Sequence, residues 1–359
     1  MIVRLRRRRP SVPVPLLCRW DLDKTYLRSE FETIRQLLRT VRERGADKVE
    51  VPGVADLIKG LKAAGERRSG RVLVYFISAS PPQIGRAIRD KLALDGVPYD
   101  GITFKDQLEN IRRGKLRQLR EHVGFKLSEL LRGRLAAPAG ARELLFGDDW
   151  ESDPLTYSLY ADVVAGRLSA GRLAPLLGRI GVDTVLMREI AGLVPRAAAS
   201  VGVHRIFINL EKRTPPAVFR LYGRRLVPTF NYFQTALVLV ADGDLDIEDA
   251  ARVGRALMER SGYTAQRLEN SLADLVRRGF LSTNAEKLAR RLRACGVLPQ
   301  TSRRGSGWLA DLMTRLRARQ GRRASRPRGL PPAGALDYDT ILDRLRPQGR
   351  TPAAEARPG

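Results

Sequence analysis

Acidic and hydroxyl side chains follow three separate apolar runs of the chain. These side chains are Asp21, Asp23, Ser78, Asp148 and Asp153. Carboxylates held close together repel each other unless a cation or a shared proton lies between them. Acids at two strand ends can hold Mg²⁺, a hard cation that takes oxygen ligands. The pattern therefore predicts a metal-assisted phosphate site, in which a lysine would complete the charge balance.

Hydrolysis of a phosphate monoester requires a nucleophile, a proton donor for the leaving oxygen and positive charge beside the phosphate oxygens. The two acidic clusters and the Ser78 hydroxyl offer complementary parts of this chemistry. An ordinary polar turn is the alternative interpretation of residues 21–25, because a D-x-D-x-T segment is short enough to arise by chance. The coincidence of three such clusters favours the phosphate site.

The same apolar runs predict the strands that must position these side chains. Strands are expected at residues 16–20, 72–77, 101–104 and 144–146, with one more at 161–164. Helices are expected at residues 29–44, 55–64, 83–94 and 106–131, the last broken near Gly124. Strands that alternate with helices indicate an α/β protein with a doubly wound parallel sheet. Such sheets bind ligands at the carboxyl ends of their strands, where the acids lie.

The pattern becomes mainly helical after about residue 168. Helices are predicted at 182–198, 246–260 and 264–279, a strand at 204–210, and either a helix or a strand at 230–240. We therefore expect four parts: a basic N-terminal tail (1–15), an α/β domain (16–168), a mainly α-helical accessory region (169–300) and an Arg-, Pro- and Gly-rich tail (301–359). The composition of the last part predicts that it is largely disordered.

The chain is strongly basic, with 65 Lys and Arg against 39 Asp and Glu and a formal net charge of +26. Residues 1–19 hold six Arg and no acid, and residues 301–359 hold 13 Arg and five acids. A phosphorylated substrate, an anionic membrane surface and nucleic acid would all be attracted by this charge. The alternative to an enzyme is therefore a catalytically idle basic protein that binds nucleic acid or an anionic surface through its tails or through the helix pair at 246–260 and 264–279.

The cysteine content and the apolar runs favour a cytoplasmic protein without a transmembrane segment. Cys18 and Cys295 are the only cysteines, and Cys18 lies inside an expected core strand, which argues against a disulfide scaffold. No run of about 18 apolar residues is present. Pro10, Pro13 and Pro15 interrupt the residues that follow the first arginines, so a signal peptide is not expected.

The clusters resemble the motifs of the haloacid dehalogenase superfamily of phosphohydrolases. W-D-L-D-K-T at residues 20–25 resembles its first motif, F-I-S-A-S-P at 76–81 its second, and G-D-D-W-E-S-D-P at 147–154 its fourth. Together with V-P-G at 51–53, they are more narrowly similar to the catalytic domain of actin-patch-associated phosphatidate phosphatases. The likeness covers about residues 16–166 and implies a Rossmann-like fold with a small cap or none.

The resemblance implies a role for each matching residue. Asp21 would attack phosphorus and form an aspartyl-phosphate, and Asp23 would protonate the leaving oxygen and then activate water. Ser78 would hydrogen-bond the transferring phosphoryl group. Thr25 and Ser80, from the same two motifs, are expected to bind substrate.

The resemblance also implies a Mg²⁺ site. Asp148, the Asp21 carboxylate and the backbone carbonyl of Asp23 would ligate the ion, and Asp153 would be either a second acidic ligand or a residue that supports the ligands from behind. Asp149 stands where the narrower family has a small residue and could compete as a ligand. Lys24 stands where that family often has an acid, which would favour a more anionic substrate.

The lysine of the third motif must be chosen by spacing. Lys126 lies 22 residues before Asp148 and opens a helix that leads back to the strand at 144–146, so we select it; Lys105 and Lys115 are the alternatives. The resemblance as a whole implies a Mg²⁺-dependent phosphatase that acts on phosphomonoesters, with a lipid phosphate such as phosphatidate as one expected substrate. Residues 29–44 would be a small lid or an ordinary surface helix.

Overall fold

The computed structural model describes residues 14–22, 25–26, 51–68, 70–78, 82–104, 115–150, 152–198, 201–281, 285–300 and 335–345. For residue 84 and residues 115–121 it describes the backbone and not the side chains. The predicted helices at 29–44 and at the start of 106–131 lie partly or wholly outside these residues, as do Asp23, Ser80 and Lys105.

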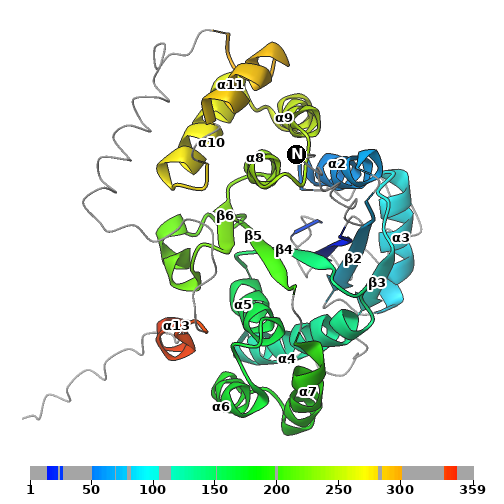
Figure 1. Ribbon diagram of the computed structural model, residues 1–359, viewed down its shortest axis with the longest axis vertical. Coiled ribbons are helices and arrows are strands. Elements are labelled where there is room, and N and C mark those ends of the chain that lie inside the picture. The colour runs from blue at the N-terminus through cyan, green and yellow to red at the C-terminus, as the bar shows by residue number, and fades with distance from the viewer. Residues whose placement is uncertain are drawn as a thin grey trace, which may run out of the picture.

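Within these residues, six strands form one parallel sheet in the order β3-β2-β1-β4-β5-β6 (Figure 1). The strands are β1 (Leu16–Asp21), β2 (Val72–Ser78), β3 (Gly101–Phe104), β4 (Arg142–Asp148), β5 (Val203–Asn209) and β6 (Leu226–Thr229). Most strand residues are buried, as expected for a sheet covered on both faces. The α/β class and the parallel sheet predicted from the sequence are confirmed.

Helices cover both faces of the sheet (Figure 1). On one side of the sheet, a single hydrophobic core joins α2 (Val54–Arg67), α3 (Gly85–Leu94), α8 (Tyr232–Asp242), α9 (Ile247–Ser261), α10 (Ala265–Arg277) and α11 (Ala285–Ala294), with α10 packed against α8 and α11 against α9. On the other side, a second core joins α4 (Lys115–Leu135), α5 (Asp153–Val164), α6 (Ala170–Ile180), α7 (Thr184–Ala197), α13 (Tyr338–Leu345) and the short turns of η3 (Pro216–Tyr222), with α6 packed against α7 and α13 against α6. A short η2 (Pro82–Ile84) precedes α3.

A row of aromatic rings crosses the sheet just below its carboxyl edge. The Trp20 ring on β1 stacks on Phe146 of β4, with centroids 3.7 Å apart, and Phe146 stacks on Phe207 of β5 at 5.3 Å. These three residues share one face because they occupy paired positions of adjacent strands. The row gives the carboxyl ends of β1, β4 and β5 a rigid floor.

Two local predictions were wrong. Residues 161–164, predicted as a strand, form the last turn of α5, which is buried on all sides and therefore lacks an amphipathic pattern. Helix α4 runs through Gly124 without a break. A side chain at Gly124 would come within 2.6 Å of Leu186 on α7, so the glycine permits close packing of two helices.

The sheet and its helical layers continue past residue 168. β5 confirms the strand predicted at 204–210, and it pairs with β4 in the same sheet. The apolar residues 230–240 form α8, which is capped by Asn231 and ends at Gly243. In the tail after residue 301, α13 is helical and buries Tyr338, Ile341 and Leu342 against the protein. In the part of the chain that the structure describes, no helix has the length and apolarity to span a membrane.

Candidate functional site at the carboxyl edge of the sheet

The acidic clusters meet where the strand order reverses direction. β1 lies between β2 and β4, so the chain winds to one side of β1 first and to the other side afterwards. A parallel sheet opens a crevice at such a point, beyond the carboxyl ends of the two central strands. Asp21 is the last residue of β1 and Asp148 is the last residue of β4, so both lie at this point.

Asp153 joins these two residues from the start of α5. Asp21, Asp148 and Asp153 each place a carboxylate oxygen within 4.8 Å of the others, and all three side chains are fully buried. The Asp148 amide donates a 3.2 Å hydrogen bond to Asp153 Oδ2, which turns the chain back over the strand end. A Cβ atom on Gly147 would lie 2.3 Å from that oxygen, so this turn requires a glycine.

Lys126 lies between two of the carboxylates. Its Nζ is 2.7 Å from Asp21 Oδ1 and 2.6 Å from Asp153 Oδ1, and the lysine side chain is fully buried. It reaches the site from α4, which crosses the sheet between β3 and β4 in the chain. The lysine selected by spacing is therefore part of the cluster, whereas Lys105 and the side chain of Lys115 lie outside the described residues.

The hydroxyl residues lie beside the cluster. Thr25 Oγ1 donates to Asp21 Oδ2 over 3.4 Å, a long hydrogen bond. Ser78 ends β2 and is fully buried at the same edge, one strand from Asp21. Asp23 and Ser80 lie outside the described residues, so their predicted roles stay predictions.

Asp149 contacts a neighbouring loop. Its two carboxylate oxygens accept hydrogen bonds from the backbone amides of Lys212 and Thr214, at 2.8 and 2.9 Å. Among the described acids, it is not one of the three whose oxygens converge. Asp149 therefore fastens the loop after β5 to the end of β4. This role differs from that of a competing metal ligand, which the sequence suggests for it.

Two buried tyrosines of the site were not foreseen. The Tyr157 hydroxyl donates to the Phe146 carbonyl over 3.3 Å, and burial, reinforced by the Asp153 carboxylate, raises the pKa of Tyr157. The Tyr232 hydroxyl donates to the Thr25 carbonyl over 2.7 Å. Burial raises the pKa of Tyr232, and the carboxylates of Glu211, Asp148 and Asp21 raise it further. Both hydroxyls therefore keep their protons at neutral pH and act as donors.

The donor set suits a hard divalent cation. The three carboxylates present only oxygen atoms, and Lys126 supplies one positive charge against three negative ones when all are ionised. Like charges that are buried together favour a bound cation or a shared proton. Asp21, Asp148 and Asp153 could therefore hold Mg²⁺.

Comparisons of the chain with protein-family models, with curated proteins and with solved structures found no match.

Proposed function

We propose that the protein is a Mg²⁺-dependent phosphomonoester hydrolase that works through an aspartyl-phosphate on Asp21. The observation that supports this most is the convergence of Asp21, Asp148 and Asp153 around Lys126 at the carboxyl edge of β1 and β4. The order of the motifs along the chain, and their resemblance to those of haloacid dehalogenase phosphohydrolases, supports the same assignment.

In the first step, an Asp21 carboxylate oxygen forms a bond to phosphorus while the bond from phosphorus to the leaving oxygen breaks. Asp23 donates its proton to that leaving oxygen. In the second step, water attacks phosphorus, the Asp23 carboxylate takes a proton from the water, and the bond between Asp21 and phosphorus breaks. Phosphate leaves, and both carboxyl groups return to their starting states.

The other residues of the site orient Asp21 and balance negative charge. Asp21, Asp148 and Asp153 would hold Mg²⁺, which when bound offsets the negative charge of the phosphate oxygens. Lys126 holds Asp21 in place through its 2.7 Å contact and keeps a positive charge beside the nucleophile. Ser78 would donate a hydrogen bond to the phosphoryl group from the neighbouring strand.

The test is Mg²⁺-dependent release of phosphate from p-nitrophenyl phosphate by wild type and by Asp21→Asn. We expect turnover by wild type that EDTA abolishes and excess Mg²⁺ restores, and no turnover by Asp21→Asn. Asp90→Asn is the matched control, because this acid is exposed on α3. Equal rates above background in wild type and Asp21→Asn would refute the proposal.

The covalent intermediate has its own test. Wild type mixed with substrate and quenched in acid should carry the mass of one phosphoryl group on the peptide that contains Asp21. A phosphoryl group found on another peptide, or turnover without any such adduct under single-turnover conditions, would contradict the assignment of Asp21 as the nucleophile.

The substrate class is proposed more narrowly as a lipid phosphate such as phosphatidate. This choice rests on the narrower motif resemblance and on the basic ends of the chain, which favour an anionic surface. Phosphatidate in vesicles should then be hydrolysed with a higher kcat/KM than soluble phosphomonoesters. Good turnover of soluble esters without turnover of phosphatidate would reject the lipid preference and leave the phosphatase proposal intact.

A further inference from the structure

Tyr232 connects the C-terminal helical layer to the turn that follows β1. Its side chain is buried, and its ring packs at a tilt against Trp20 of β1, with centroids 5.9 Å apart. Its hydroxyl donates a 2.7 Å hydrogen bond to the backbone carbonyl of Thr25, 207 residues earlier in the chain. Because the Tyr232 pKa is raised by burial and by nearby carboxylates, this hydroxyl remains a donor.

The carbonyl that Tyr232 contacts belongs to the peptide unit between Thr25 and Tyr26. The amide of the same unit donates to the Leu22 carbonyl over 3.1 Å, which closes the turn after β1. This peptide is therefore held from both sides. The Thr25 hydroxyl on the same turn donates to Asp21 Oδ2 over 3.4 Å. At that length a small displacement of the turn breaks the contact.

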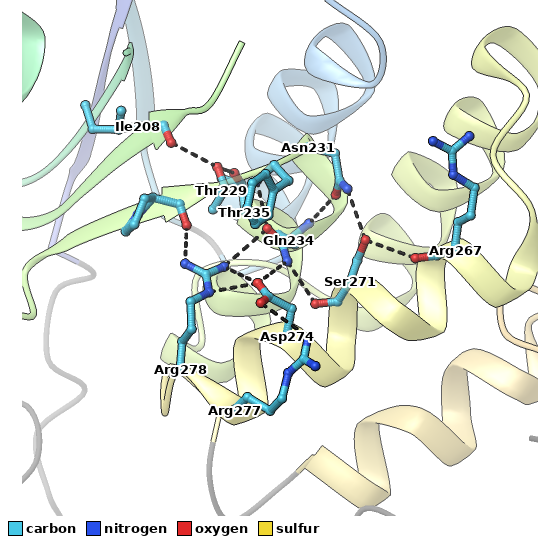
Figure 2. A network of polar contacts seen from close by, with 12 residues as sticks. Ile208, Thr229, Asn231, Gln234, Thr235, Arg267, Ser271, Asp274, Arg277 and Arg278 are labelled. Atoms are coloured by element: carbon cyan, nitrogen blue, oxygen red, sulfur yellow. Dashed lines mark hydrogen bonds and ion pairs between the residues drawn. The ribbon is translucent and has the colours of Figure 1, made fainter. Parts of the chain in front are cut away.

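Tyr232 is itself fixed by a polar network between α8 and α10 (Figure 2). Asn231, just before Tyr232, caps α8 by accepting from the Gln234 amide and donates to Ser271 Oγ over 3.1 Å. The buried Gln234 donates to the Ser271 carbonyl over 2.9 Å and to Asp274 over 3.0 Å. The first turn of α8 is thus hydrogen-bonded to α10 on both sides of Tyr232.

We propose that Tyr232 is a positioning residue for Asp21 and acts through Thr25; this inference rests on the proposed function. The two oxygens of Asp21 are held from opposite layers of the protein. Lys126 on α4 contacts Oδ1, and Thr25, anchored by Tyr232 on α8, contacts Oδ2. The region after residue 168 therefore takes part in the chemistry by fixing the rotation of the nucleophile, without touching the substrate.

Kinetics of Tyr232→Phe test this role. The variant keeps the ring and loses the hydrogen bond to Thr25, so the turn can shift and misalign Asp21. We expect kcat to fall by about 10-fold to 100-fold, with KM changed by less than about threefold, because misalignment affects the reacting geometry more than ground-state binding. A wild-type kcat, or a loss confined to KM, would overturn the proposal.

Tyr338→Phe is the matched control. Tyr338 is also buried, and its hydroxyl donates to Asp162 over 2.9 Å, at the far end of α5 from Asp153. Both variants should lower Tm, but only Tyr232→Phe should lower kcat. Equal losses of kcat in the two variants would mean that Tyr232 acts only through general stability, which contradicts the proposal.

A double-mutant cycle tests the route through Thr25. Thr25→Val removes the hydroxyl that contacts Asp21 and keeps the carbonyl that accepts from Tyr232. Tyr232→Phe should then lower kcat by a much smaller factor in the Thr25→Val background than in wild type. If the factors by which the two substitutions lower kcat simply multiply in the double variant, Tyr232 does not act through Thr25.

Hydrogen exchange gives a readout that does not depend on activity. In Tyr232→Phe the Tyr26 amide should exchange about 10-fold faster than in wild type, while the amides of β4 keep their rates. An unchanged Tyr26 rate would overturn the positioning role even in an active enzyme. Absence of phosphatase activity with a faster Tyr26 rate would instead refute the proposed function and retain the contact as a structural one.

Discussion

Lys126 Nζ lies 2.6 Å from Asp153 Oδ1, although the two residues are 27 positions apart along the chain. Both side chains are fully buried. The contact joins α4 to the first residue of α5, across the end of β4. The same ammonium group reaches Asp21 on β1. One lysine on α4 therefore connects β1 and α5, two of the three elements whose carboxylates form the candidate metal site.

Lys126→Met should destabilise the protein and make it more dependent on Mg²⁺. Removal of the Lys126 ammonium group leaves buried carboxylates without their described counter-charge. Breaking a buried ion pair in this way costs about 3 to 5 kcal/mol. Added Mg²⁺ should raise the Tm of the variant more than that of wild type. Thermal unfolding with and without Mg²⁺ measures both effects. Lys287→Met, at an exposed lysine on α11, should behave as wild type.

If Lys126→Met and Lys287→Met cost the same stability, the buried lysine does not counter the charge of the cluster. If Mg²⁺ raises the Tm of Lys126→Met no more than the Tm of wild type, Mg²⁺ and Lys126 do not balance the charge of the same carboxylates.

Gly147→Ala should displace Asp153. The added methyl group would lie 2.3 Å from Asp153 Oδ2 and 2.7 Å from its Cβ, so the carboxylate must leave the Asp148 amide and Lys126. We expect a loss of about 2 to 4 kcal/mol in unfolding free energy and a weaker Mg²⁺ response. Urea unfolding and Mg²⁺ titration of Tm measure these changes.

Gly192→Ala is the control for this substitution. Gly192 lies on the exposed side of α7, and a methyl group there meets no atom within 4 Å. Alanine favours a helix over glycine by about 0.5 to 1 kcal/mol, so this variant should be slightly more stable than wild type. A Gly147→Ala protein as stable as Gly192→Ala would show that Asp153 is free to move.

The sequence predicts most directly the parts of the site that end a strand. Asp21 and Asp148 are predicted because an apolar run marks each strand, and parallel strands bring their carboxyl ends to one edge. Lys126, on α4, is predicted by its distance from Asp148 along the chain. Tyr232 carries no such signal, because it begins a helix 207 residues after Thr25 and only the tertiary fold brings the two together.

The two wrong predictions of local structure have the same origin. Residues 161–164 have the composition of a strand, but α5 is buried on every side and so shows no helical periodicity. A glycine such as Gly124 is typical of a helix break, but here its lack of a side chain permits close contact with Leu186 on α7. In both cases a neighbouring element decides the local structure, and a local pattern does not contain that neighbour.

Asp242 should make stability depend on pH below neutrality. Burial alone would raise its pKa, but hydrogen bonds and charge from Arg205 and His204 outweigh burial and lower the pKa from 3.8 to about 2. A carboxyl group whose pKa is lowered by folding stabilises the protein above its unfolded pKa. That stability is lost as the pH falls through the folded pKa.

Asp242→Asn tests this prediction. The variant should be less stable than wild type by at most about 2 kcal/mol at pH 7, and the difference should shrink between about pH 5 and pH 2. Urea unfolding at a series of pH values measures the difference. Arg205→Met should reduce the same pH dependence, because Arg205 donates to both oxygens of Asp242, at 2.7 and 2.8 Å. A constant difference from pH 7 to pH 3 would contradict the lowered pKa.

Glu143→Gln should destabilise the fold without altering the chemistry of the site. Glu143 is fully buried near the start of β4 and accepts hydrogen bonds from Arg19 and Arg134, each at 2.9 Å, and from the Tyr160 hydroxyl. An amide cannot balance two buried guanidinium groups, so we expect a loss of about 3 to 5 kcal/mol in urea unfolding. Glu248→Gln, whose partner Arg291 is more than half exposed, should cost at most about 1 kcal/mol.

The folded Glu143→Gln protein should keep the wild-type kcat, because Glu143 and Asp148 lie toward opposite ends of β4. A loss of kcat in fully folded protein would show that this ion-pair network also supports the site.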